Sequence, residues 1–187
     1  MGGVCALKVR IHPSLILWLS ILFYLSPGLV LPFLFAAGFH EAGHTLMLWK
    51  LGKSPKNLIL SFSGAKLETP PMGYREERLA AAAGPMCSFL LSLLWPVLPV
   101  TALYSFILGL INLFPVPGLD GFRILKTTLY LRVSQERAEQ MTNIISYAFS
   151  ITLSLCTSFL AAYLGLGLWP VILVAVFLLR TIQRPPC

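Results

Sequence analysis

The feature that most constrains this chain is its division into long apolar runs separated by short polar connections. Of its 187 residues, 57% are hydrophobic and only 11% are charged, whereas about a quarter of a soluble domain is charged. Several runs approach the roughly 20 residues that cross a bilayer as a helix. We therefore predict an all-α membrane protein, a polytopic bundle of about six transmembrane helices. The predicted spans are residues 13–26, 29–51, 79–98, 100–114, 142–164 and 168–182.

The positions of the basic residues support six spans and an orientation. If the N-terminus is cytoplasmic, residues 1–12, 50–78, 115–141 and 180–187 lie inside, and all 14 Lys and Arg fall within these segments. This is the distribution that the positive-inside rule describes. We expect a multi-pass protein of the cell membrane, in contact with the lipid bilayer, with both termini cytoplasmic. Because the basic residues do not cluster with aromatic ones, we expect no nucleic-acid partner.

The second predicted span contains ionisable residues, which are costly at that depth. Residues 40–44 read HEAGH, and a charge near the bilayer centre costs roughly 2.5–3.5 kcal/mol or more. On a helix, His40 and His44 project from one face about one turn apart, so both can bind one zinc ion. Glu41 lies beside such a metal, where its carboxylate can take a proton from water. The alternative is a hydrogen-bonded structural pair with Glu41 in a buried salt bridge.

A third metal ligand is predicted after the fourth span. Asp120 is the chain's single aspartate, and the topology places it at a depth similar to that of the two histidines. Gly118 and Gly121 permit a sharp turn that can aim its carboxylate inward. We expect His40, His44 and Asp120 to bind one zinc ion per chain, because a catalytic zinc commonly has three protein ligands. The alternative for this segment is an ordinary turn.

These motifs together resemble a known family. HEAGH on an early span, paired with NLFPVPGLDG at 112–121, is similar to the site-2 protease family of intramembrane zinc metalloproteases, peptidase family M50. HPSLILWL at 12–19 and AAAAGP at 80–85 resemble that family too. The layout without a PDZ domain is closest to the subgroup of the stage IV sporulation protease, although we expect no CBS domain, which is common there. We expect a single integral-membrane metalloprotease domain over 1–187.

The resemblance implies a function. It implies a zinc metalloendopeptidase that hydrolyses peptide bonds of transmembrane or membrane-associated protein substrates, in regulated intramembrane proteolysis. A membrane regulatory protein is a further expected partner. Asn112, which matches the family's asparagine, would donate a hydrogen bond to substrate or to the developing oxyanion; an interhelical hydrogen bond is the alternative. Residues 57–68 would form a re-entrant β-hairpin that pairs with extended substrate, or else a plain cytoplasmic hairpin.

Two other functions compete with proteolysis. Intramembrane His, Glu and Asp side chains can line an ion path, so a membrane metal-ion transporter is the main alternative. An inactive relative that binds transmembrane segments is another. A transporter needs several sites along a pore, whereas the predicted spans offer one compact cluster. The intact set Glu41, His40, His44 and Asp120 argues against an inactive relative.

Overall fold

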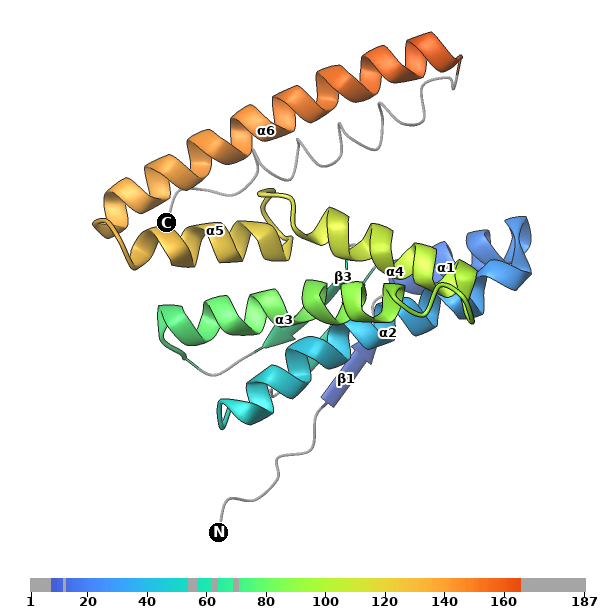
Figure 1. Cartoon of the computed structure of the whole chain (residues 1–187), viewed down its shortest axis with the longest axis horizontal. Coiled ribbons are helices and arrows are strands. Elements are labelled where there is room, and N and C mark those ends of the chain that lie inside the picture. The colour runs from blue at the N-terminus through green and yellow to red at the C-terminus, as the bar shows by residue number, and fades with distance from the viewer. Residues whose placement is uncertain (1–7, 12, 54–56, 62–63, 69–70, 166–187) are drawn as a thin grey trace. The chain divides into compact units, whose positions relative to one another are not determined.

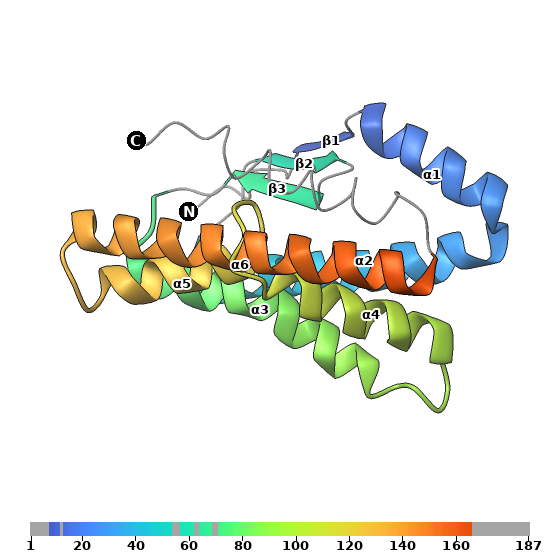
Figure 2. The same ribbon diagram turned by 90° about the horizontal axis from the view of Figure 1, so that it is seen from above.

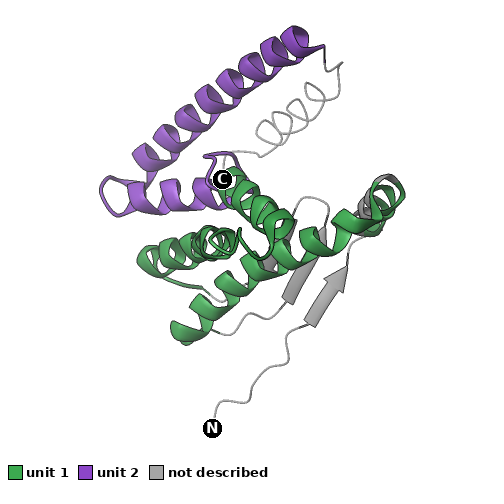
Figure 3. Ribbon diagram, turned by 45° about the vertical axis from the view of Figure 1, so that its right-hand side comes forward, with its two compact units in different colours: residues 1–112 green, residues 113–187 purple. Residues whose placement is uncertain are grey.

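The structure is a computed structural model of the whole chain, and it describes residues 8–11, 13–53, 57–61, 64–68 and 71–165. The chain divides into two compact units, Met1–Asn112 and Leu113–Cys187 (Figure 3).

The first unit contains four helices, and prolines open three of them. The helices are α1 (Pro13–Leu25), α2 (Pro27–Lys50), α3 (Tyr74–Ser92) and α4 (Pro99–Asn112). Proline suits the first helical position because its φ is already helical and its missing N–H would have no partner there. Helix α3 instead begins with a cap in which Glu76 accepts a hydrogen bond from the Gly73 N–H at 3.0 Å.

Helices α2, α3 and α4 lie side by side (Figures 1 and 2) and pack through small residues. A Cβ placed on Gly43 of α2 would lie only 2.7 Å from the Ala83 carbonyl oxygen of α3. A Cβ on Gly109 of α4 would lie 3.0 Å from the Cβ of Ser88. Such close backbone approach is typical of helices that associate within membranes, where small residues replace a hydrophobic driving force.

Many large apolar side chains of the described helices are exposed, and most of the buried apolar residues are alanines. Ala36 and Ala81 are fully buried, whereas Leu31 is 78% exposed and Trp49 is 63% exposed. A water-soluble domain would bury such large side chains. Such an arrangement suits a protein in a lipid bilayer, because lipid tails solvate apolar surface.

Three short strands complete the first unit: β1 (Lys8–Ile11), β2 (Asn57–Ser61) and β3 (Gly64–Glu68). Strand β2 lies in the middle, parallel to β1 and antiparallel to β3, with Leu58 opposite Leu67. The predicted hairpin segment, 57–68, thus contains β2 and β3, and its re-entry into the membrane stays a prediction. Strand β1 was not predicted.

The second unit contains α5 (Asp120–Tyr130) and α6 (Gln135–Leu164), which lie side by side (Figures 1 and 2). A polar group, here called the α5–α6 clamp, joins them. In this clamp Tyr130 Oη donates a hydrogen bond to Glu139 Oε1 at 2.6 Å, and Lys126 Nζ lies 3.5 Å from the same oxygen. Helix α6 ends at Gly165, whose φ of +64° is the left-handed conformation that favours glycine at a helix C-terminus.

The predicted spans and the observed helices correspond with shifted ends. Helices α1, α2 and α4 agree with the predictions to within two residues, but α3 runs over 74–92 rather than 79–98, and α6 begins at 135 rather than 142. Helix α5 lies in the predicted polar connection and was missed. The sixth predicted span, 168–182, lies outside the described residues. Among the described helices, Gln135–Tyr163 is the one long and apolar enough to cross a membrane, and Pro99–Asn112 is apolar but shorter. The six-span count therefore stays a prediction.

Candidate metal centre

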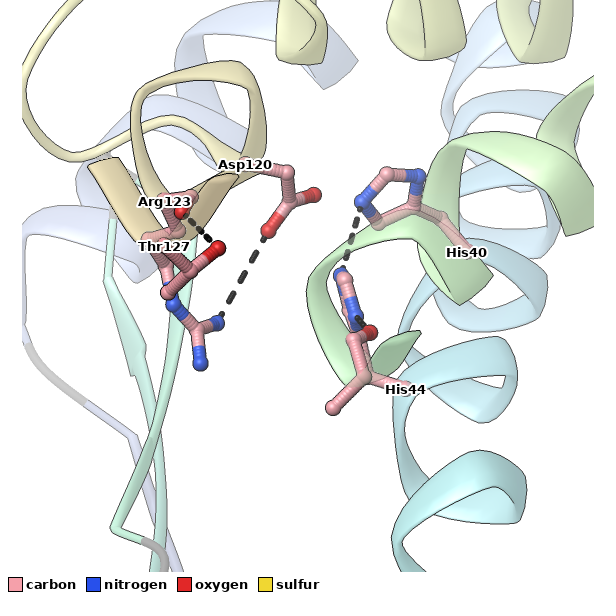
Figure 4. A network of polar contacts seen from close by, with 6 residues as sticks. His40, His44, Asp120, Arg123 and Thr127 are labelled. Atoms are coloured by element: carbon pink, nitrogen blue, oxygen red, sulfur yellow. Dashed lines mark hydrogen bonds and ion pairs between the residues drawn. The ribbon is translucent and has the colours of Figure 1, made fainter. Parts of the chain in front are cut away.

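His40 and His44 lie one turn apart in α2 and turn their rings toward each other (Figure 4). Both are buried, with 3% and 8% of their surface exposed. Their Nε2 atoms are 3.3 Å apart. The i and i+4 spacing in HEAGH produces this arrangement because an α-helix has 3.6 residues per turn.

The second nitrogen of each ring contacts α3. His44 Nδ1 lies 2.8 Å from the Ala80 carbonyl oxygen, and His40 Nδ1 lies 2.8 Å from Ser88 Oγ. A carbonyl oxygen can only accept, so His44 Nδ1 carries a proton and donates it. In the neutral ring the lone pair is then on Nε2, the atom that faces His40. Metal-ligating histidines are commonly held in this way, with one nitrogen for the metal and the other bonded to the protein.

The pair fits a zinc ion in three respects. Two nitrogens about 2.05 Å from a tetrahedral zinc are separated by about 3.3 Å, which is the separation found between the two Nε2 atoms. The tautomer of His44 presents the correct nitrogen. Finally, a Cβ on Gly84 would overlap His44 Nε2 and lie 2.8 Å from His40 Nε2, so the glycine keeps this side of the pair open.

Glu41 follows His40 directly on α2 and is partly exposed. Successive residues on a helix are turned by about 100°, so its side chain emerges beside the histidine face rather than on it. Thr45 Oγ1 donates a hydrogen bond to the Glu41 carbonyl oxygen at 3.0 Å. This bond engages the backbone of Glu41 and not its carboxylate.

Asp120 belongs to the second unit, where it is the first residue of α5 and is 8% exposed. The positive end of the helix dipole favours its charged form. Arg123 Nη1 lies 3.9 Å from Asp120 Oδ1, one turn along the same helix (Figure 4). Asp120 is thus a buried carboxylate with a basic partner on its own helix, and a carboxylate must be deprotonated to bind a metal.

The turn before Asp120 depends on both predicted glycines. Gly118 has φ +99°, a conformation that other residues rarely adopt. A Cβ on Gly121 would overlap the Leu113 carbonyl group, so the chain can double back here only because this residue is glycine. The segment 113–119, between α4 and α5, therefore contains a tight, specific turn.

Asn112 is the last residue of α4. Its Nδ2 donates a hydrogen bond to the Leu108 carbonyl oxygen of the same helix at 2.9 Å. The amide carries a second N–H besides the one in this bond. The observed bond is within one helix, unlike the interhelical bond that is the alternative role for this residue.

Sequence reasoning missed the partners of the two histidines. Ser88 lies just after the AAAAGP motif, four residues beyond Gly84. The sequence alone does not distinguish it from other serines in apolar segments. Ala80 contributes only its backbone. Their role follows from the register between α2 and α3, which the sequence of neither helix specifies alone.

Comparisons with known proteins agree with this arrangement. Residues 92–155 match the model of peptidase family M50, a segment that contains Asn112 and Asp120 but not HEAGH. No curated protein matches the chain. The structure is similar to that of the Site-2 Protease from Methanocaldococcus jannaschii, with a TM-score of 0.70 and 20% identity, over 100% of this chain and 94% of that one.

The resemblance to the site-2 protease family is confirmed. The chain has the fold of a site-2 protease, and its match to peptidase family M50 over residues 92–155 supports a peptidase. Membership of the stage IV sporulation subgroup stays a prediction.

Proposed function

We propose that this chain is an intramembrane zinc metalloendopeptidase that cleaves transmembrane or membrane-associated proteins. The observation that carries the proposal is the histidine pair of α2, whose Nε2 atoms are 3.3 Å apart and whose Nδ1 atoms are both bonded to α3. The match to peptidase family M50 supports hydrolysis of peptide bonds. The outward-facing large apolar residues support a site within the bilayer.

In this proposal His40, His44 and Asp120 hold one zinc ion per chain. When bound, zinc would supply an activated water and polarise the scissile carbonyl group. The burial of all three side chains supports this ligand set, because a dry site strengthens charge–dipole interactions. Asp120 is also the one aspartate that the chain contains.

Glu41 and Asn112 act on the substrate's atoms. The Glu41 carboxylate accepts a proton from the attacking water while the water oxygen bonds to the carbonyl carbon of the substrate. Glu41 later donates that proton to the leaving amine as the C–N bond breaks. The second N–H of Asn112 donates a hydrogen bond to the developing oxyanion.

A helical substrate must unwind locally before attack, because its carbonyl groups are engaged in hydrogen bonds. In the described sheet β2 is paired on both sides, so the outer edge of β3 supplies the backbone donors and acceptors that would hold such an extended segment. We propose that this hairpin re-enters the membrane. We also propose that six spans place both termini in the cytoplasm. A membrane regulatory protein then controls substrate access.

Glu41→Gln tests the proposal and separates it from metal transport. The variant should retain zinc, because Glu41 is not among the ligands, and should lose cleavage by about 10²–10⁴-fold because the proton acceptor is gone. Mass spectrometry of transmembrane fragments in cells that produce either form measures cleavage, and elemental analysis of the purified protein measures zinc.

Glu136→Gln is the matched control, because Glu136 is an exposed residue in the first turn of α6. This variant should change neither cleavage nor zinc content. Fragments that are identical with and without Glu41 would contradict the protease proposal, and unchanged fragments together with altered metal flux would favour the transporter.

A further inference from the structure

Ser88 is a side chain of α3 that hydrogen-bonds to the histidine pair. It is fully buried, and its Oγ lies 2.8 Å from His40 Nδ1. Helix α4 packs against it at Gly109, where a Cβ would come within 3.0 Å of the Ser88 Cβ. The hydroxyl is thus enclosed between helices and directed at one ring nitrogen.

The two histidines differ in what fixes them. His44 donates to a backbone carbonyl, which no substitution of a side chain removes, whereas His40 depends on a hydroxyl that can either accept or donate. When Ser88 Oγ accepts from His40 Nδ1, the Nε2 lone pair of His40 faces Nε2 of His44. The opposite tautomer puts a proton on Nε2, where a metal would bind.

We propose that Ser88 is a positioning residue: it holds His40 in the tautomer and ring orientation that bind a metal, and so sets the affinity of the site. This inference rests on the proposed metalloprotease function. Loss of the hydroxyl leaves a buried Nδ1–H without its acceptor or lets the ring turn, and loss of such partners typically weakens metal binding by about 10–100-fold.

Ser88→Ala tests this inference in the full chain purified in detergent micelles. Zinc affinity is measured by competition with a fluorescent chelator, and we expect it to fall by about 10–100-fold. Circular dichroism and thermal unfolding of the metal-free protein show whether the helices are retained, which we expect because alanine fits wherever serine does.

Two matched control serines lie on α3 and α4. Ser92 Oγ donates to the Phe89 carbonyl oxygen within α3 at 2.7 Å. Ser105 of α4 is as buried as Ser88, and its Oγ has no hydrogen-bond partner in the part of the chain that the structure describes. Ser92→Ala and Ser105→Ala should change zinc affinity by less than about two-fold, since neither hydroxyl contacts a proposed ligand.

A second measurement reports the tautomer of the His40 ring. The chain has three histidines, so ¹⁵N-histidine labelling gives few signals, and long-range ¹H–¹⁵N spectra distinguish the two tautomers. With zinc bound, Ser88→Ala should alter the signals of His40 and leave those of His44 unchanged. A merely structural serine would alter both or neither.

The outcomes separate the two proposals. If the unmodified chain binds zinc tightly and Ser88→Ala binds it equally well, or if His40 keeps its tautomer, the role of Ser88 is refuted while the metal site stands. If the unmodified chain does not bind zinc, both proposals fall.

Discussion

In the α2–α3 pair, both histidines lie in the interior of the long helix α2, and both rings are hydrogen-bonded to α3. In the α5–α6 hairpin, Asp120 lies on the first turn of an 11-residue helix and pairs with Arg123 on the same helix. Small residues bring α2 and α3 together, whereas the α5–α6 clamp is made of long polar side chains. The histidines are therefore fixed by packing, and the aspartate by its turn and its helix.

The largest expected effect comes from filling the space beside the histidines. Gly84→Ala places a methyl group where His44 Nε2 lies and 2.8 Å from His40 Nε2, so at least one ring must move. Loss of the contacts that orient a metal ligand costs about 10–100-fold in metal affinity, and because the ring itself is displaced here we expect zinc affinity to fall by about 100-fold. Chelator competition measures it.

Gly38→Ala is the control for this substitution. Gly38 lies in α2, and a methyl group added there would have no neighbouring atom within 4 Å. Alanine at this position should stabilise the helix by roughly 0.5–1 kcal/mol and leave zinc affinity unchanged. Equal zinc affinity in the two alanine variants would refute the tight packing around the histidines.

A smaller effect is expected from the turn before Asp120. In Gly121→Ala the new methyl group meets the Leu113 carbonyl group, so the turn must open and Asp120 must shift. We expect cleavage and zinc affinity to fall by about 10-fold. The ¹⁵N signals of His40 and His44 in the metal-free protein should not change, because the α2–α3 contacts are untouched. A shift of those signals would show that the turn also positions the histidines.

The smallest effect is expected from the α5–α6 clamp. Tyr130→Phe removes the hydrogen bond to Glu139, and because a partly exposed polar pair contributes little, zinc affinity should change by less than about two-fold. Tyr163→Phe is the control, since Tyr163 is 79% exposed. A large loss of zinc in Tyr130→Phe would show that the clamp, rather than the turn, positions Asp120.

The clamp also predicts a pH dependence. Burial and the bond to Glu139 raise the pKa of Tyr130 above its ordinary value of 10.0. The folded state therefore favours the protonated phenol, and this contribution to stability is present at neutral pH and is lost as the pH rises through the raised pKa. Thermal unfolding followed by circular dichroism at pH 8 and above pH 10 should show a steeper alkaline loss in the unmodified chain than in Tyr130→Phe.

Much of the helical framework was predictable, because apolar length and proline placement act locally. Pro13 and Pro27 begin helices, and the HEAGH spacing alone brings two imidazoles to one face. Helix α5 was missed because Arg123, Lys126 and Thr127 made its segment read as a connection. Strand β1 was missed because four residues with two charges, KVRI, give no strand signal without the partner strand.

The rest of the centre depends on contacts between helices. That Gly84 faces both rings, and that Ser88 and the Ala80 carbonyl bind them, follows from how α2 and α3 are aligned. Many alignments would suit two helices rich in small residues, and single-sequence patterns do not choose among them.

The two bonds from α3 to the histidine rings have a consequence for substrate entry. If α2 slid or rotated against α3, both imidazoles would lose their anchors at once, and a metal held by them would be bound more weakly. In the proposed protease, α2 and α3 would therefore move as one rigid body while a substrate enters.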